Sequence, residues 1–352
     1  MSNLKDKRVA VIGTGATAVQ CVPHIGESAK ELFVFQRTPS SIDVRNNRPT
    51  DTEWLLNQKP GWHQKRRDNF ETLLTGGQVK KDLVSDGWTE AFRLLFGSLR
   101  EKAPSKMQMA SWAATSIFSS EMYKKGFKSY MTDKAMEAMD IHNAMQMADF
   151  QKMEQVRARA QEVVKDEKTA ESLKPYYNQF CKRPCFHDEY LQTFNLPNVH
   201  LIDTDGKGLS EITEKGIVFE GVEYEVDCII FATGFEVGTE YSRRAGYQIN
   251  GRDGISITEK WQNGLSTFHG MHCNQFPNSF FFGPAQSGFT ATYTYSLDEQ
   301  SIHLAYILKS AKEKGATLIE ASKEAEDKWV QTIIEKARIT ADFQNNCTPG
   351  YY

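Results

Sequence analysis

The sequence predicts an α/β fold built on a Rossmann-like parallel sheet that a large helical block interrupts. A short apolar run at residues 9–12 is followed by a glycine turn and a helical pattern, as in the first βαβ unit of such a sheet. Further apolar runs follow at 32–35 and 226–235, the last nearly all apolar. Between them, residues 51–174 are poor in glycine and rich in Lys, Glu, Gln, Met and Ala, which favours helices.

The glycine turn after the first predicted strand is a candidate dinucleotide site. It has the pattern G-x-G-x-x-A, with Gly13, Gly15 and Ala18 at the defining positions. One glycine makes the turn, the next lets the backbone approach a pyrophosphate, and the small third residue packs helix against strand. The free N–H groups at the helix start then face the phosphates. The same pattern also occurs by chance, so a tight strand–helix turn without a ligand is the alternative.

The end of the second predicted strand indicates which dinucleotide fits. An NAD site usually has Asp or Glu here, to accept a hydrogen bond from the ribose 2′-hydroxyl. This sequence has Arg37 and Thr38 after Gln36 instead. A guanidinium and a hydroxyl suit a 2′-phosphate, so the sequence predicts NADP(H) rather than NAD(H). The alternative for Arg37 is an ordinary surface arginine.

Length, charge and cysteine spacing narrow the class of protein. The chain has 352 residues, enough for one large domain or for two to three ordinary ones. Its net charge of −3 gives no electrostatic case for binding nucleic acid or an anionic membrane. Without a signal peptide or a membrane-length apolar stretch, we expect a cytoplasmic protein. Cys181, Cys185 and His187 match no usual zinc spacing, so we expect six reduced cysteines and no metal.

The remaining segments carry further expectations and two open alternatives. Residues 45–48, a basic part of a loop at 40–50, contact either phosphate or solvent. Four tryptophans either anchor the helical block or line a substrate cavity: Trp54, Trp62, Trp88 and Trp112. We also predict helical patterns at 136–145 and 153–164, a strand at 198–203, a hairpin at 217–224 that turns at Glu220 and Gly221, a central parallel strand at 226–235, a buried strand at 278–282, and amphipathic helices at 296–313 and 320–337.

An ordered series of motifs runs along nearly the whole chain. It comprises GTGATAVQ at 13–20, FQRTP at 35–39, KRP at 182–184, YLQTFNLPNV at 190–199, IFATGF at 230–235 and FPNxFxxGP at 276–284. This series resembles the flavin-dependent Baeyer–Villiger monooxygenases, particularly the long fungal type of secondary metabolism. The resemblance implies an enzyme that uses NADPH, FAD and O2 to insert oxygen next to a ketone, such as a terpenoid or polyketide intermediate, and so forms an ester or lactone.

The resemblance also assigns roles to individual residues. The implied cofactor-binding residues are Gly13, Thr14, Gly15, Ala16, Thr17, Ala18, Val19, Gln20, Arg37, Thr38, Lys182 and Arg183. In this scheme residues 14–20 line the pyrophosphate, and Arg37, Thr38 and Lys182 hold the 2′-phosphate. Arg183 is the catalytic arginine, because a permanently charged guanidinium favours an anionic peroxyflavin and stabilises an oxyanion on the substrate. From the residues alone, Lys182 and Arg183 would be a plain surface basic pair.

The resemblance divides the chain into three parts. Residues 1–40 and 175–234 form the NADP-binding domain, 41–174 the helical insertion, and 235–352 the C-terminal remnant of an FAD-type domain. The family's own FAD turn, a further G-x-G-x-x-G, and its F-x-G-x-x-x-H fingerprint do not occur in this sequence. We therefore expect a truncated chain, with a separate FAD-domain chain as a candidate partner. Two other interpretations stay open: a flavin monooxygenase that oxidises nitrogen or sulfur, and a non-catalytic NADP-binding fragment.

Overall fold

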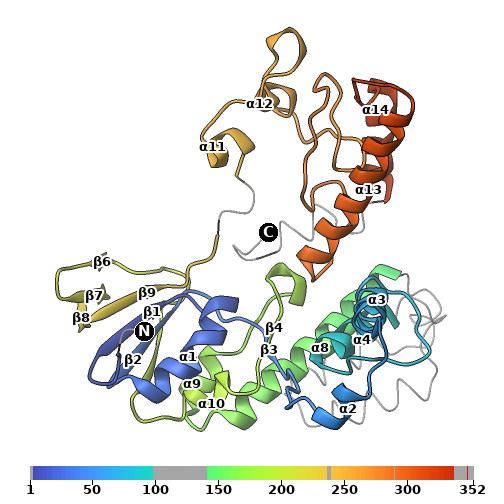
Figure 1. Ribbon diagram of the computed structural model, residues 1–352. Coiled ribbons are helices and arrows are strands. Elements are labelled where there is room, and N and C mark those ends of the chain that lie inside the picture. The colour runs from blue at the N-terminus through green and yellow to red at the C-terminus, as the bar shows by residue number, and fades with distance from the viewer. Residues whose placement is uncertain (1–2, 98–140, 236–238, 289, 337–346, 348–352) are drawn as a thin grey trace. The chain divides into compact units, whose positions relative to one another are not determined.

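The computed structural model describes residues 3–97, 141–235, 239–288, 290–336 and 347 (Figure 1). The chain divides into two compact units. The first comprises Met1–Phe235 and Cys347–Tyr352, and the second Glu236–Asn346. Trp112 and the predicted helical pattern at 136–140 lie outside the described residues. Among the helices that the structure describes, none combines the length and the apolar character that crossing a bilayer requires.

A four-stranded parallel sheet forms the centre of the first unit (Figure 1). Its strands, in spatial order, are β5 (Val199–Asp203), β2 (Glu31–Gln36), β1 (Arg8–Ile12) and β9 (Cys228–Phe231). Every neighbouring pair is parallel. With α1 (Ala16–Ser28) as the crossover between β1 and β2, this arrangement confirms the predicted α/β class with a Rossmann-type sheet.

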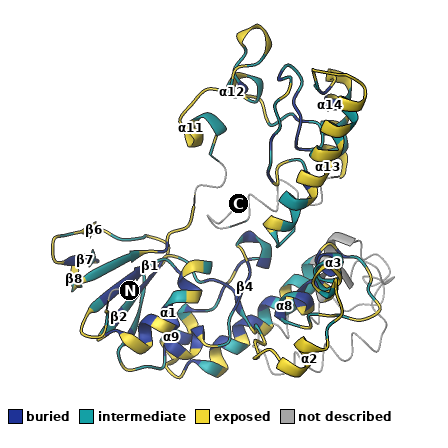
Figure 2. Cartoon of the chain, viewed as in Figure 1, coloured by how far each residue is buried: buried dark blue, intermediate teal, exposed yellow. Residues whose placement is uncertain are grey.

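Side chains of β1 alternate between two apolar clusters, one on each face of the sheet. Val9 and Val11 are fully buried in the cluster that α1 covers, whereas Ala10 lies in the other cluster with Phe35 and Ile217. A strand directs successive side chains to opposite faces, so an uninterrupted apolar run requires cover on both. Figure 2 shows the resulting burial of the strands. The first cluster is completed by α9 (Glu167–Ser172) and α10 (Tyr190–Thr193).

The opposite face is covered by a small antiparallel sheet of β6 (Glu211–Ile212), β7 (Gly216–Phe219) and β8 (Val222–Glu225). The predicted hairpin is confirmed, since β7 and β8 pair in antiparallel register. Its two turn residues, Glu220 and Gly221, both have positive φ, 48° and 80°. Two positive φ values are typical of the two-residue turn whose twist matches that of the flanking strands.

The described part of the helical block contains α2 (Thr52–Leu56), α3 (Trp62–Leu74), α4 (Gly87–Gly97) and α8 (Ile141–Val163). Just before it, in the predicted loop, β3 (Ile42–Asp43) pairs in parallel with β4 (Cys185–Phe186). The Trp88 ring lies 4.5 Å from the ring of Phe186. Trp88 therefore anchors α4 to β4. This agrees with the first of the two alternatives for the tryptophans, that they anchor the helical block.

Two strand predictions are wrong. The run at 226–235 was expected in the centre of the sheet, but β9 has one partner, β1, and forms an edge of the described sheet. Apolar composition indicates burial of the faces and does not reveal how many hydrogen-bonding neighbours a strand has. Residues 278–282 form no strand, although Phe281 is 7 % exposed. The Asn278 N–H donates to the Ile319 carbonyl and the Phe281 N–H to the Met271 carbonyl, both at 2.8 Å. These two bonds go to different segments, so they do not form the continuous ladder that a strand requires.

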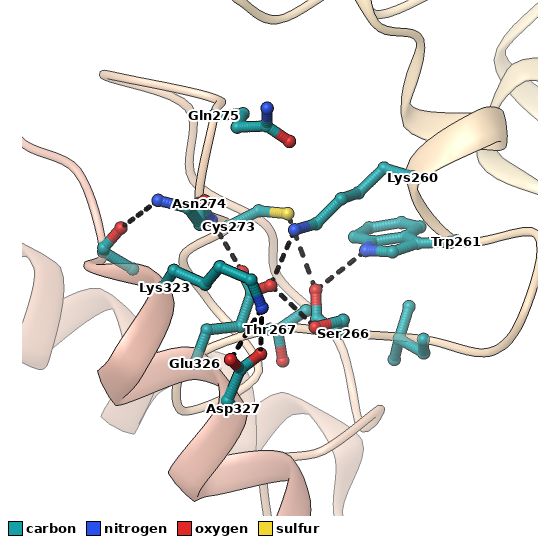
Figure 3. Close-up of polar contacts among 12 residues, drawn as sticks. Lys260, Trp261, Ser266, Thr267, Cys273, Asn274, Gln275, Lys323, Glu326 and Asp327 are labelled. Atoms are coloured by element: carbon teal, nitrogen blue, oxygen red, sulfur yellow. Dashed lines mark hydrogen bonds and ion pairs between the residues drawn. The ribbon is translucent and has the colours of Figure 1, made fainter.

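The second unit contains α11 (Tyr241–Ala245), η2 (Arg252–Gly254), α12 (Ile257–Lys260), α13 (Tyr293–Glu313) and α14 (Lys323–Lys336). The last two confirm the predicted C-terminal helices, with ends that differ from the predicted ones by at most three residues. The buried carboxylate of Glu326 joins α14 to the segment that follows α12 (Figure 3). It accepts from the Ser266 hydroxyl and from the Asn274 amide, both at 2.6 Å, and pairs with the Lys260 ammonium at 2.8 Å. A charge this deeply buried is stable only when its oxygens are satisfied in this way.

The expectation of six reduced cysteines is wrong for two of them. Cys181 and Cys347 form a disulfide, while Cys21, Cys185, Cys228 and Cys273 are free. The pair is separated by 166 positions. Spacing along the sequence can indicate only cysteine pairs that are close in sequence. Cys181 and Cys347 are brought together by the fold, so the sequence did not predict their disulfide.

Candidate nucleotide-binding site

The turn after β1 requires glycine at its first position. Gly13 has a φ of +103°, and its N–H donates to the Phe35 carbonyl at 2.9 Å. A Cβ on this residue would lie 2.5 Å from the carbonyl oxygen of Ala232. Both the backbone conformation and the close approach of the chain after β9 therefore exclude a larger side chain. The turn thus ties together the carboxyl ends of β1, β2 and β9, the edge at which parallel sheets bind ligands.

Helix α1 begins directly after this turn with amide donors that its own backbone does not use. Gly15 is the N-cap residue, no side chain caps the helix, and its first turn contains no acidic residue. The first intrahelical bond runs from the Val19 N–H to the Gly15 carbonyl at 3.0 Å. A Cβ on Gly15 would meet no atom within 4 Å, so the space in front of the helix is open. Free amides beside open space are suited to a pyrophosphate.

The predicted residues of this segment divide into supporting and outward-facing ones. Ala18 and Val19 are 0 % and 2 % exposed and pack in the core. The Gln20 side chain donates back to the Ala16 carbonyl at 2.9 Å along the helix surface. Thr17 is exposed.

Thr14 fixes the distance between the turn and the end of β2. It is 5 % exposed, and its hydroxyl donates to the Thr38 carbonyl at 2.9 Å. Its own carbonyl accepts from the Ser40 hydroxyl at 2.6 Å. Arg37 and Thr38 are thereby held next to the glycine turn. The contribution of Ser40 was not foreseen, because a lone serine in a predicted loop has no distinguishing signal.

Two cationic side chains approach each other from different parts of the chain. Arg37 is exposed at the end of β2, and Lys182 is half-buried after η1 (Gln179–Cys181). Burial and the positive charge of Arg37 lower the pKa of Lys182 to about 8. Neither side chain forms an ion pair within the described part of the chain. Adjacent uncompensated cations are unfavourable by themselves and favour an anionic ligand.

Lys182 and Arg183 are neighbours in sequence but have different surroundings. The Lys182 ammonium lies 5.4 Å from the ring centroid of Tyr177, whereas Arg183 is exposed. Burial raises the pKa of the nearby Cys185 thiol to about 11, and the Arg183 charge opposes this shift. The thiol donates weakly to the Arg183 carbonyl, at 3.6 Å. Arg183 is thus available for a role distinct from that of Lys182.

The basic loop at residues 45–48 is held by carboxylates. The backbone amides of Arg45, Asn46 and Asn47 donate to the Asp188 carboxylate at 2.8–3.0 Å. The Arg45 guanidinium pairs with Asp86 at 2.7 Å. Three of the four residues therefore have acidic partners, and this loop is a weaker phosphate candidate than Arg37 and Lys182.

The site fits a phosphorylated dinucleotide, with open space at Gly15, unpaired amides and two cations. Among the described elements, one glycine turn lies between a parallel strand and a helix. Within the same residues, no three His, Cys, Asp or Glu side chains lie together so as to hold a metal ion. The fold and the site define a dinucleotide-binding protein of the Rossmann type.

Comparisons with known proteins agree with this class. No protein-family model matches the chain. It is 48 % identical over 351 residues to the Baeyer–Villiger monooxygenase ATR8 of Stachybotrys chlorohalonatus, covering 100 % of this chain and 52 % of the relative. It is 47 % identical over 354 residues to neopentalenolactone D synthase of Streptomyces avermitilis, covering 100 % of this chain and 54 % of that protein.

Solved structures extend the similarity to the fold. The polycyclic ketone monooxygenase of Thermothelomyces thermophila matches with a TM-score of 0.78 and 39 % identity, covering 99 % of this chain and 52 % of that one. An oxidised steroid monooxygenase bound to NADP matches with a TM-score of 0.70 and 26 % identity, covering 99 % and 61 %. The whole length of the chain is therefore similar to parts of these proteins, and it spans about half the length of the curated relatives it matches.

Proposed function

We propose that this chain is the NADPH-binding part of an NADPH- and FAD-dependent Baeyer–Villiger monooxygenase, which inserts oxygen next to a ketone to give an ester or lactone. The observation that carries the proposal is the cation pair of Arg37 and Lys182 beside the glycine turn, in a chain related to this family. A ketone intermediate of fungal secondary metabolism, a terpenoid or polyketide, is the proposed substrate class, with O2 as co-substrate and the cytoplasm as the location.

The proposed roles follow from the position of each group. The free amides at the start of α1 hold the pyrophosphate, while Arg37, Lys182 and the Thr38 hydroxyl hold the 2′-phosphate. When bound, NADPH supplies a hydride. The positive charge of the exposed Arg183 stabilises negative charge that develops at the reacting carbonyl oxygen of the ketone. We assign no step to the flavin, because the described residues offer it no binding turn.

The proposal retains the division into domains that the family resemblance implies. Residues 1–40 and 175–234 bind NADPH, 41–174 form a helical insertion, and 235–352 belong to a domain of the FAD type. The flavin site then has to be completed by residues outside those described. A separately expressed FAD-binding domain is one proposed source, and its addition to this chain should produce a yellow complex that oxidises NADPH.

Cofactor titration tests the proposal on the chain as it exists. We expect NADPH to bind at least about 10-fold more tightly than NADH in calorimetry, because only NADPH offers a 2′-phosphate to the two cations. Arg37→Gln should lower NADPH affinity about 10-fold and leave NADH affinity unchanged. Arg8→Gln is the matched control, since Arg8 lies at the opposite end of β1 and pairs with Glu225. Equal losses for the two cofactors in Arg37→Gln would overturn the 2′-phosphate assignment.

The variant Arg183→Ala distinguishes a role of this residue in catalysis from a role in NADPH binding. Arg183→Ala should retain NADPH affinity, because the proposal assigns the 2′-phosphate to Arg37, Thr38 and Lys182. In a complex reconstituted with an FAD-binding domain, the same variant should form no lactone. Lactone formation by Arg183→Ala would refute the catalytic role and favour the oxidation of nitrogen or sulfur.

A non-catalytic NADP-binding fragment is the second candidate. The single dinucleotide turn among the described residues favours it. It predicts the same discrimination between NADPH and NADH, but no retained flavin and no NADPH oxidation after FAD or an FAD-binding domain is added.

A further inference from the structure

We infer that Tyr177 is a positioning residue for the 2′-phosphate subsite, because it connects Lys182 to the loop that carries Arg37. The inference rests on the proposed NADPH site and adds to it a residue that would not itself contact the cofactor. Tyr177 is 9 % exposed and lies in the segment between α9 and η1. Its two functional groups contact two different parts of the site.

The hydroxyl of Tyr177 contacts the β2 side of the site. It donates to the Pro39 carbonyl at 2.8 Å. Pro39 follows Thr38, whose carbonyl in turn accepts from Thr14 at 2.9 Å. The loop after β2 is therefore fixed at two successive carbonyls, one bonded to the glycine turn and the other to Tyr177.

The ring of Tyr177 contacts the η1 side of the site. The Lys182 ammonium lies 5.4 Å from the ring centroid, within the range of a cation–π contact. Arg37 repels this ammonium, so a flexible lysine with no other partner would extend away into solvent. The aromatic face compensates for part of this repulsion and keeps the ammonium near Arg37. One side chain thus holds both cations at a fixed separation before any anion arrives.

Tyr177 itself is held in place from α8. The Gln179 amide donates to the Asp149 carboxylate at 2.9 Å, and the Asn178 side chain donates to the Gln146 side chain at 3.0 Å. The guanidinium of Arg157 donates to the Pro175 carbonyl at 2.8 Å. Both sides of Tyr177 are therefore anchored to one helix, which makes its position rigid enough to orient Lys182. Such pre-organisation increases affinity by reducing the entropy lost on binding.

The experiment compares the affinities for NADP+ and NAD+ in Tyr177 variants of the full chain. Tyr177→Leu removes both contacts and should weaken NADP+ binding about 5- to 10-fold while leaving NAD+ binding unchanged. Tyr177→Phe keeps the ring and should recover most of this loss. The matched control is Tyr176→Leu, because Tyr176 is 67 % exposed and its hydroxyl bonds Glu171. Equal losses for the two cofactors would mean that Tyr177 only supports the fold, and unchanged affinity would likewise overturn the inference.

A double-mutant cycle and a pH profile distinguish positioning from general stability. Adding Tyr177→Leu to Lys182→Met should cause a smaller loss of NADP+ affinity than Tyr177→Leu causes in the wild type, since the ring acts through Lys182 and only the Pro39 contact remains to be lost. The wild-type affinity for NADP+ should decline as Lys182 deprotonates, near pH 8 in the free protein. In Tyr177→Leu this decline should move to higher pH, because a solvated ammonium keeps its proton longer. If Tyr177→Leu does not fold, Tyr177→Met replaces it in the cycle, because Met also lacks the aromatic face that contacts Lys182.

One comparison keeps the two proposals apart. A wild-type chain that binds NADP+ and NAD+ equally well refutes the proposed cofactor site. A wild-type chain that prefers NADP+, together with a Tyr177→Leu variant that keeps this preference, refutes only the role of Tyr177.

Discussion

At the scale of single residues, the two glycines of the glycine turn have different roles, one in the fold and one in ligand access. Gly13 has positive φ and faces the Ala232 carbonyl, so the fold itself depends on it. Gly15 has a φ of −74° and open space around it, so the fold does not need a glycine there. The absence of a side chain at Gly15 matters for what approaches from outside.

This difference predicts opposite outcomes for two alanine substitutions. Gly13→Ala should destabilise the protein by roughly 2 kcal/mol or more, because it strains the backbone and overlaps Ala232. Gly15→Ala should change stability by no more than about 1 kcal/mol. Its methyl group should nevertheless weaken NADPH binding about 10-fold by keeping the pyrophosphate from the amides. Urea denaturation and calorimetric titration measure the two effects, and a reversed pattern would contradict the proposed roles.

At the scale of elements, α8 connects the helical insertion to the cofactor site. Its Asp149 carboxylate accepts from the Gln179 amide and so holds the start of η1. Burial raises the pKa of Asp149 to about 6, although the amide and the charge of Arg157 both oppose the shift. The folded protein therefore binds a proton at this carboxyl at a pH at which the unfolded chain has released it.

The sign of the resulting pH dependence follows from linkage. Because the pKa of Asp149 in the folded protein lies above the usual value of 3.8, the contribution of Asp149 to stability is complete below pH 3.8. It is lost as pH rises through about 6. Asp149→Asn should abolish this dependence and stabilise the protein at pH 8 by about 1–2 kcal/mol, measured by urea denaturation between pH 4 and 8.

Asp166→Asn provides a control of opposite sign. Hydrogen bonds from Thr169 hold the pKa of the exposed Asp166 below its usual value. Its stabilising effect is therefore present at neutral pH and disappears as pH falls. If Asp149→Asn shows the same trend as this control, the role inferred for Asp149 is wrong.

At the scale of the whole molecule, the disulfide closes the longest loop that the structure defines. Cys181 directly precedes Lys182, and Cys347 lies 166 positions away, beyond the whole second unit. Closing so long a loop restricts the unfolded chain more than the folded one. The chain-entropy estimate gives an upper limit of roughly 5 kcal/mol for this effect.

Reduction should therefore lower the thermal stability of the chain. A dithiol reductant should decrease the Tm of the wild type. Cys347→Ser should have the Tm of the reduced wild type, with or without reductant. Calorimetric scans with free-thiol quantification measure both. A wild-type Tm that does not respond, with six free thiols already present before reduction, would show that the bond does not form.

The sequence alone allowed much of the architecture to be predicted, because strands, turns and helix starts depend on neighbouring residues. The strand–turn–helix unit at residues 8–28, the hairpin at Glu220 and the two C-terminal helices are of this kind. The strand expected at 278–282 failed because pairing depends on a distant partner. The same limit applied to the central position expected for β9.

The candidate site divides in the same way. Gly13, Gly15 and Arg37 follow from a local motif and from the residue type at the end of a strand. Lys182 and Arg183 were assigned through family resemblance, and sequence reasoning alone would have left them as surface residues. Tyr177, Ser40 and the partner of Cys181 had no signal, since their roles depend on contacts between segments far apart in sequence.

The sequence by itself determined that this protein has a parallel α/β sheet with a glycine turn suited to a phosphorylated dinucleotide. Apolar periodicity and glycine placement suffice for that, because they act over a few residues. Only the tertiary structure decided that Lys182 meets Arg37 over the ring of Tyr177, that α8 holds η1, and that Cys181 pairs with Cys347. The approach of Lys182 to Arg37, the bond between α8 and η1 and the disulfide each join positions at least 30 residues apart. Burial and electrostatics act through space rather than along the chain.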